Sequence, residues 1–238
     1  MMQVILTSYR RLAYMRRTVE SLRQDPIELY IIDGGSDPET VEWIKQSADG
    51  WLLFRHNPGA DFLKTEGIKA FGTDNEFLVT ADDLLYPAGY SDRIRANYLA
   101  LNSHYPEIEW TFCACQMEHQ RITEWDTING IECRPAKTSQ VAGAIIDREI
   151  CRQVGYFPNY GRTGQGDFAF NSRLEAIGIR RCYWRDPCLI HIGADKPKDY
   201  PALHAEYCAD KRRHMPHGRA DDGHTLDPGR QAPEMGKR

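Results

Sequence analysis

Long hydrophobic runs are missing from the sequence. Its longest apolar stretches, such as residues 141–146, are far shorter than the roughly 20 residues that a membrane-spanning helix needs. The first residues, MMQVILTSYRR, form an apolar strand pattern at once, without a charged leader or a small-residue cleavage site. We therefore expect a protein without a transmembrane segment, located in the cytoplasm.

Paired cysteines are also missing, because none of the seven cysteines belongs to a CxxC motif. A chain of 238 residues can bury a core without disulfides, so reduced thiols are expected. Cys182, Cys188 and His191 follow one another in the sequence, but their spacing is more typical of buried small side chains than of a zinc site. The cysteines therefore carry no functional prediction.

Three common fingerprints of nucleotide-binding proteins and hydrolases are absent. Gly34-Gly35-Ser36 follows the second expected strand and lacks the GxGxxG spacing. The sequence has no Walker loop and no GxSxG elbow. These absences argue against a dinucleotide-dependent dehydrogenase, a P-loop ATPase and a serine hydrolase.

The composition is that of a soluble globular protein, with 41% hydrophobic and 27% charged residues and a net charge of −4. The length allows one large domain with an appendage, which we place at residues 1–213. From residue 214 to 238, Gly, Pro, Asp, His and Arg dominate and apolar periodicity is lost, which predicts a flexible tail. Residues 211–238 hold seven Lys or Arg against four Asp or Glu, and this basic excess suits either an anionic partner or a solvated tail.

Strands alternate with helices over about residues 1–100, the first half of the predicted domain. Strands are expected over 4–7, 28–33, 51–54 and 76–80, and helices over 12–23, 38–49 and 61–71. Asp37 followed by Pro38 is a strong helix start, since the carboxylate can cap free amides and proline fits the first helical position. The pattern predicts a doubly wound, Rossmann-like α/β fold with a mainly parallel sheet.

The second half of the predicted domain, residues 101–213, has a different pattern. Strands are expected over 108–117, 121–126, 131–134 and 180–184, with Asn129-Gly130 as a hairpin turn, and helices over 90–101, 147–154, 167–177 and 200–213. The sequence therefore predicts an antiparallel extension of the parallel sheet.

Polar residues follow three of the expected parallel strands, at Thr7 to Arg11, at Asp33 to Ser36 and at the pair Asp82-Asp83. Ligands of such sheets bind outside the carboxyl ends of the strands, so one cleft is expected to collect all three groups. Two adjacent carboxylates suit a hard divalent cation that carries phosphate oxygens. The alternative, that the pair only caps the loop before Pro87, remains open.

Seven segments together resemble a GT-A glycosyltransferase, closest to the inverting family 2-like enzymes that use nucleotide-diphosphate sugars. The resemblance runs from about Val4 to Gly193. It is carried by VILTSYRR (4–11), ELYIIDGGSD (28–37), NPGADFLKTEGIKAF (57–71), EFLVTADDLLYP (76–87), VAGAIIDREICRQVGYF (141–157), GQGDFAFNSRLEAIG (164–178) and CLIHIG (188–193). Their order along the chain is what makes the resemblance specific.

The resemblance implies a role for individual residues. It makes Asp167 the catalytic base, and Asp83 and His191 the ligands of a Mn²⁺ or Mg²⁺ ion. The nucleotide contacts that it implies are Thr7, Tyr9, Arg10, Asp33, Gly34, Lys64 and Asp82. Each residue also has a structural alternative, such as a loop-satisfying Thr7, a surface Lys64, a core His191 or a helix-capping Asp167.

Two positions depart from the family pattern. Thr80 stands where the first aspartate of the metal-binding signature often lies, which leaves open whether Asp82 or Asp83 is the ligand. Gly166 replaces the usual glutamate before Asp167, which leaves Asp167 alone to carry the proton.

The resemblance implies a metal-dependent hexosyl- or pentosyltransferase that moves a sugar from a UDP-sugar to a hydroxyl acceptor with inversion. The expected acceptor is a saccharide or a lipid-linked sugar, with a modified base in DNA as a minority hypothesis. One alternative is a nucleotidyltransferase that makes nucleotide sugars, although Thr7 to Arg11 lacks the glycine-rich phosphate loop that it needs. The other is a non-catalytic binding protein of the same fold, and the oligomeric state is open.

Overall fold

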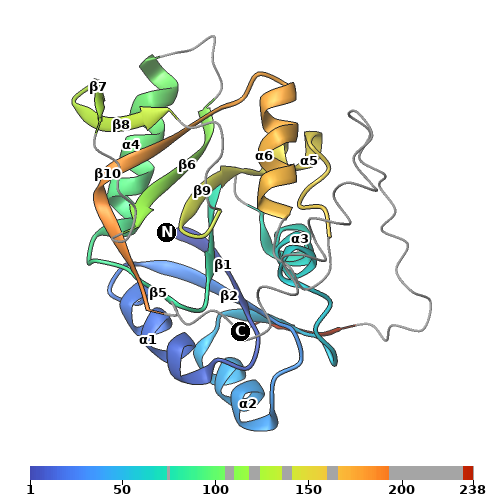
Figure 1. Ribbon diagram of the computed structural model, residues 1–238. Coiled ribbons are helices and arrows are strands. Elements are labelled where there is room, and N and C mark those ends of the chain that lie inside the picture. Colours follow the sequence, from blue (N-terminus) through green and yellow to red (C-terminus); the bar gives the residue numbers. More distant parts are fainter. Residues whose placement is uncertain are drawn as a thin grey trace.

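The computed structural model describes residues 1–73, 76–104, 110–117, 124–135, 141–159, 166–192 and 233–237 (Figure 1). The helices in this part of the chain are α1 (Leu12–Leu22), α2 (Pro38–Ser47), α3 (Ala60–Phe71), α4 (Tyr90–His104), α5 (Arg148–Gln153) and α6 (Gly166–Ala176). The strands are β1 (Met2–Ser8), β2 (Ile27–Asp33), β3 (Gly50–Leu53), β4 (Glu76–Ala81), β5 (Leu84–Leu85), β6 (Trp110–Met117), β7 (Asp126–Ile128), β8 (Ile131–Pro135), β9 (Ala144–Asp147), β10 (Arg180–His191) and β11 (Glu234–Lys237).

All strands join one sheet, in which β3, β2, β1 and β4 are neighbours and run parallel. The register places Ser8 beside Asp33 and Thr7 beside Ala81, so β1, β2 and β4 end at the same edge. This is the edge at which the sequence predicts the cleft. The doubly wound, mainly parallel centre is confirmed.

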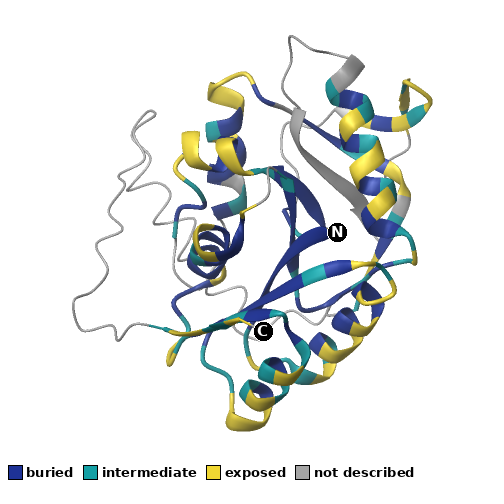
Figure 2. Ribbon diagram, turned by 180° about the vertical axis from the view of Figure 1, so that it is seen from behind, coloured by how far each residue is buried: buried dark blue, intermediate teal, exposed yellow. Residues whose placement is uncertain are grey.

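Helices cover both faces of the sheet because side chains of each strand alternate between the faces. On one face Val4 and Leu6 of β1 pack with residues of α1, α2 and α4. On the other face Ile5 packs with residues of α3, α5 and α6. Figure 2 shows the result from behind, with almost wholly buried central strands between helices that are exposed on their outer sides.

The second half adds the antiparallel extension. Strand β9 lies between β4 and β6 and is antiparallel to both, while β10 runs parallel to β6 and antiparallel to β8. The Asn129-Gly130 turn between β7 and β8 has φ of 52° and 77°, as a two-residue hairpin turn requires. Strand β10 is longer than the predicted 180–184, and its far end pairs with β5, placing His191 opposite Leu84.

The C-terminal end differs from the prediction of an unstructured tail. Residues Glu234–Lys237 form β11, which pairs antiparallel with β3 at the edge of the sheet. Gly236 makes this possible, because a Cβ there would lie 2.3 Å from the Trp51 ring. The strand went unpredicted because four residues are too few to show a period. The remainder of the predicted tail and the predicted helix 200–213 lie outside the described residues.

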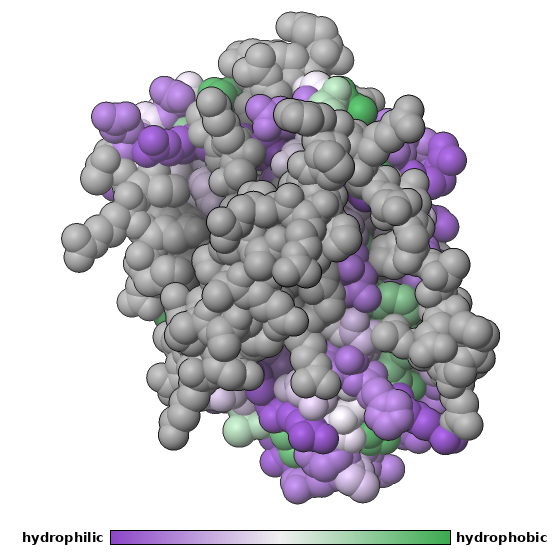
Figure 3. Space-filling view, turned by 45° about the vertical axis from the view of Figure 1, so that its right-hand side comes forward, coloured by the Kyte–Doolittle hydropathy of each residue, from purple (hydrophilic) through white to green (hydrophobic). Residues whose placement is uncertain are grey.

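The described surface carries scattered hydrophobic residues. Figure 3 shows a mostly hydrophilic surface at the foot of the molecule, around α2. Among the described residues, the large hydrophobic side chains that are exposed lie far apart in the sequence: Met1, Leu99, Ile177, Ile190 and Met235. None of the helices that the structure describes is long and apolar enough to cross a membrane.

Candidate active site

The loop after β2 is organised around Asp33, which is fully buried. Its Oδ1 accepts hydrogen bonds from Gly35 N (3.0 Å) and Ser36 N (2.8 Å), and its Oδ2 accepts one from Ser36 Oγ (2.6 Å). Burial raises the pKa of Asp33, against the hydrogen bonds from Ser36 and Gly35. Asp33 thus shapes its own loop, and its carboxylate has remaining acceptor capacity for a ligand.

The loop after β1 is tied to both neighbouring loops. Thr7 Oγ1 donates to Thr80 O at 3.5 Å, and Tyr9 N donates to Asp82 Oδ2 at 3.4 Å. Arg10 N donates to Ser36 Oγ at 2.7 Å, and Arg10 itself is exposed with a φ of 55°. Gly34, which follows β2, donates from its backbone nitrogen to Ser8 O at 2.9 Å. The predicted nucleotide-contacting residues on these strands therefore form one rim.

The acidic pair after β4 divides into two environments. Asp82 is buried, and burial followed by the charge of Asp83 raises its pKa to about 7. Asp83 Oδ2 lies 2.6 Å from Arg11 Nη1 and 3.2 Å from His191 Nε2. His191 reaches this position because β10 pairs with β5 and because Ile192 N donates to Asp83 O at 2.9 Å. The structure thus joins Asp83 to His191, as the metal prediction requires.

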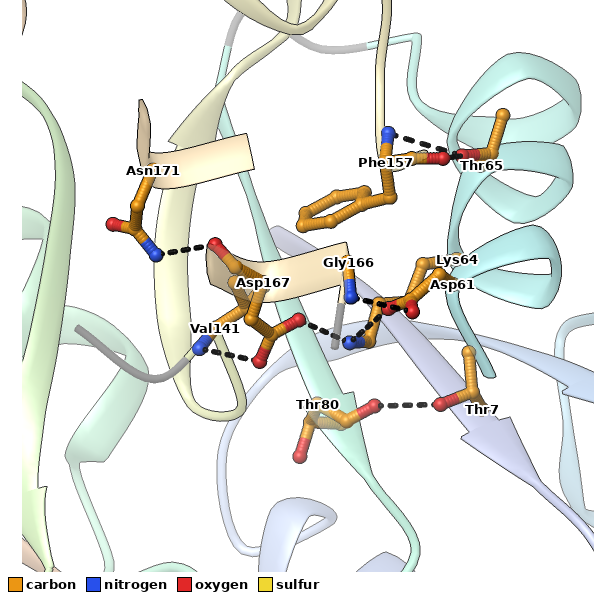
Figure 4. A network of polar contacts seen from close by, with 10 residues as sticks. All are labelled: Thr7, Asp61, Lys64, Thr65, Thr80, Val141, Phe157, Gly166, Asp167 and Asn171. Atoms are coloured by element: carbon orange, nitrogen blue, oxygen red, sulfur yellow. Dashed lines mark hydrogen bonds and ion pairs between the residues drawn. The ribbon is translucent and has the colours of Figure 1, made fainter. Parts of the chain in front are cut away.

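A second charged cluster joins α3 to the start of α6 (Figure 4). Lys64 Nζ lies 2.6 Å from Asp167 Oδ1 and 3.2 Å from Asp61 Oδ1. Asp61 Oδ2 also accepts a hydrogen bond from Gly166 N at 2.8 Å, and Asp167 Oδ2 accepts one from Val141 N at 3.3 Å. The predicted base is therefore held by groups from two other segments.

About the first third of the chain matches a known family. Residues 3–85 match Glycosyl transferase family 2, which covers the three strand-end loops described above. Asp167 and His191 lie beyond the matched residues. No curated protein sequence matches the chain.

Solved structures of TarS from S. aureus share the fold. TarS 1–349 in complex with UDP-GlcNAc superposes with a TM-score of 0.60 at 14% identity, over 94% of this chain and 68% of that one. A second structure of TarS gives 0.58 at 13% identity, and here the chain spans 41% of the TarS chain. TarS 1–349 in another structure gives 0.58 at 14% identity, over 94% and 67% of the two chains. At these identities the likeness concerns the fold alone.

The chain has a GT-A fold, and its residues 3–85 match the family 2 glycosyltransferases. Thr80 offers no acidic ligand at the position where the metal-binding signature often has one. It is buried and hydrogen-bonded to the Tyr86 hydroxyl. The candidate acidic ligands at the end of β4 are therefore Asp82 and Asp83.

The geometry of Asp83 and His191 fits part of a metal shell. Neighbouring ligands of an octahedral ion at about 2.1 Å from the metal lie about 3 Å apart, close to the 3.2 Å between Asp83 Oδ2 and His191 Nε2. The described residues contain no group of three or more His, Cys, Asp or Glu side chains placed to hold a metal. Two protein ligands suit an ion that takes its other ligands from phosphate and water. In the structure the positive charge beside Asp83 is that of Arg11.

Asp61 is the site residue that sequence reasoning missed. The available signal was the spacing of Asp61, Lys64 and Thr65, three polar residues that share one face of a helix with Ile68. Packing explains why glycine stands at position 166, where this sequence departs from the family pattern. A Cβ at residue 166 would lie 2.4 Å from Asp61 Cγ and 2.6 Å from Pro158 O, so only glycine fits there.

Proposed function

We propose that this protein is a glycosyltransferase that transfers a hexose or pentose from a UDP-sugar to a hydroxyl acceptor, with inversion and with a Mn²⁺ or Mg²⁺ ion. The observation that carries the proposal is the convergence of Thr7–Arg11, Asp33 and Asp82-Asp83 at one sheet edge, with His191 added from β10. Carboxyl ends of parallel strands are where such sheets bind nucleotides. The complex of the similarly folded TarS with UDP-GlcNAc supports a nucleotide-sugar donor.

The strand-end residues are assigned to the donor. Asp33 and Gly34 line the nucleoside side in this proposal, together with Thr7 and Tyr9, while Arg10 reaches the diphosphate from its exposed position. Asp82 orients the first loop through Tyr9 N. A divalent ion at Asp83 and His191, when bound, stabilises the negative charge that develops on the leaving diphosphate.

Asp167 is assigned to the acceptor proton. Its carboxylate accepts the proton of the acceptor hydroxyl while that oxygen forms a bond to the anomeric carbon. The bond from this carbon to the diphosphate oxygen breaks, and its electron pair leaves with the diphosphate. Attack from the side opposite the leaving group inverts the anomeric centre.

The test is a screen of nucleotide sugars against saccharides, lipid-linked sugars and DNA with modified bases, read by mass spectrometry. We expect product with a UDP-sugar and Mn²⁺, loss of turnover with a chelator, and loss of Mn²⁺ and UDP binding in Asp83→Ala. Asp92→Ala, which changes an exposed carboxylate in α4, is the matched control. Turnover that survives chelation, together with normal UDP and Mn²⁺ binding by Asp83→Ala, overturns the metal assignment.

Two further assays separate the alternatives. Release of pyrophosphate from UTP and a sugar 1-phosphate identifies a nucleotidyltransferase. Binding of UDP without transfer or donor hydrolysis identifies a binding protein. Either result replaces the proposed activity.

A further inference from the structure

Helix α3 carries polar side chains on its buried face, which is unusual for a helix that covers a sheet. Asp61 is fully buried, and Lys64 and Thr65 are 8% and 2% exposed. The same helix is pressed against the parallel strands at Gly67, where a Cβ would lie 2.6 Å from the Ile32 side chain. Polar side chains buried on so closely packed a helix need hydrogen-bond or ion-pair partners in the segments that face them.

Each member of the stripe contacts the segment that leads to the base. Thr65 Oγ1 donates to Phe157 O at 3.1 Å and accepts from Phe157 N at 3.2 Å. Asp61 accepts from Gly166 N, and Lys64 pairs with Asp167. Helix α3 thus holds the chain before α6 and at its first turn, about 100 residues away in sequence.

Lys64 lies between two negative charges and an aromatic ring. Its Nζ lies 5.2 Å from the centre of the Phe157 ring, which stacks on Phe170 at 4.1 Å. Burial acts to lower the pKa of Lys64, but the charges of Asp167 and Asp61 outweigh it, so the pKa lies above its ordinary value. The amine therefore remains an ammonium ion beside Asp167.

We propose that Asp61 and Lys64 are positioning residues that hold the Asp167 carboxylate, ionised and oriented, for removal of the acceptor proton. This inference rests on the proposed role of Asp167 as the base. The charged groups that face Asp167 among the described residues are Lys64 and, one step further, Asp61, both from α3. The contact from the other side is the uncharged amide of Val141.

The two residues act on Asp167 with opposite sign. An ammonium ion at 2.6 Å favours the ionised carboxylate, and the like charge of Asp61 disfavours it. Removing Lys64 should therefore make Asp167 titrate at higher pH, and neutralising Asp61 should make it titrate at lower pH. Because any nearby charge shifts a titration in this way, the transfer kinetics are needed to show that the two residues act on proton removal.

The experiment measures the titration of the Asp167 carboxyl carbon by NMR in the full chain, assigned by its loss in Asp167→Asn. We expect Lys64→Met to raise the titration midpoint by about one pH unit or more. Lys64→Arg should stay near wild type, and Asp61→Asn should lower the midpoint. Lys69→Met changes a more exposed lysine of α3 that pairs with Glu66, and it should leave the midpoint unchanged.

Transfer kinetics provide the second readout. In Lys64→Met we expect kcat to fall at least tenfold at neutral pH, the acid limb of the pH–rate profile to move with the NMR midpoint, and the donor KM to stay within twofold. An unmoved midpoint in both Lys64→Met and Asp61→Asn overturns the inference. Weakened UDP binding with an unmoved acid limb also overturns it, since Lys64 would then act on the nucleotide.

Failure of the proposed function is recognised separately. If Asp167→Asn transfers sugar as well as wild type, Asp167 is not the base, and the positioning role fails with it. If Asp167→Asn is inactive and the midpoints do not move, only the inference fails. Should Lys64→Met not fold, Asp61→Asn decides alone, because its amide keeps the volume and the acceptor oxygen that Gly166 N uses.

Discussion

Arg11 Nη1 lies 2.6 Å from Asp83 Oδ2, the same oxygen that faces His191 Nε2 at 3.2 Å. The guanidinium supplies the positive charge that the acidic pair needs when no cation is present. A divalent ion bound to this oxygen would meet a like charge close by. Arg11 is therefore expected to oppose metal binding in the absence of the donor.

Arg11→Met should bind Mn²⁺ severalfold more tightly than wild type when nucleotide is absent, because a like charge next to the ion is removed. Isothermal titration calorimetry with MnCl₂ measures the effect. Arg10→Met is the control, since Arg10 is exposed and belongs to the same loop. An unchanged or weakened affinity for Mn²⁺ in Arg11→Met would place the metal away from Asp83 Oδ2.

Asp33→Asn should change how stability depends on pH. Burial raises the pKa of Asp33 in the folded protein, so its contribution to stability is fully present below the unfolded pKa and is lost as pH rises through the folded pKa. Asparagine has no charge to bury. The variant should therefore gain stability relative to wild type as pH rises from the unfolded to the folded pKa of Asp33. Melting temperatures of both proteins between about pH 3.5 and 8 test this, starting below the ordinary Asp pKa. If the melting temperature of Asp33→Asn falls relative to that of wild type as pH rises, the prediction is wrong.

Gly236→Val should detach the C-terminal strand, because any Cβ at this position meets the Trp51 ring. Strand β11 pairs four residues with β3, and Glu234 lies 2.6 Å from Lys45. The loss of a few exposed backbone hydrogen bonds corresponds to about 1–3 kcal/mol, or several degrees in Tm. Met235→Ala, at a side chain that is 66% exposed, is the control. Equal melting temperatures for Gly236→Val and wild type would show that β11 adds nothing measurable to stability.

Asp167→Asn should lose at least two orders of magnitude in transfer while UDP and metal binding stay normal. A general base typically contributes 10²- to 10⁴-fold, and an amide cannot accept the proton. Some loss of stability is expected as well, since the carboxylate holds both Lys64 and Val141 N. Asp147→Asn is the control, because Asp147 also caps a helix, through Ile150 N, and lies opposite Glu76, at the end of β4 away from the site. Transfer within a few-fold of wild type by Asp167→Asn would show that Asp167 is not the base.

Local sequence determined the parts of the fold that depend on a few neighbouring residues. The prediction that Asp37 and Pro38 start a helix is confirmed, with Asp37 Oδ1 accepting from Thr40 N at 2.9 Å. The hairpin at Asn129-Gly130 is confirmed by the positive φ values of both residues. Such signals are readable because backbone torsions and near-neighbour hydrogen bonds are set within one turn of chain.

The clustering of strand-end residues was also readable, because parallel strands in a doubly wound sheet must end at one edge. Tertiary structure alone decided which side chains meet there. His191 reaches Asp83 through the β5–β10 pairing, and Lys64 is buried between Asp61 and Asp167 instead of lying on the surface. These contacts span more than 100 residues in two of the three pairs, and they depend on strand register and on how closely α3 packs. Neither is encoded in the spacing of residues along the chain.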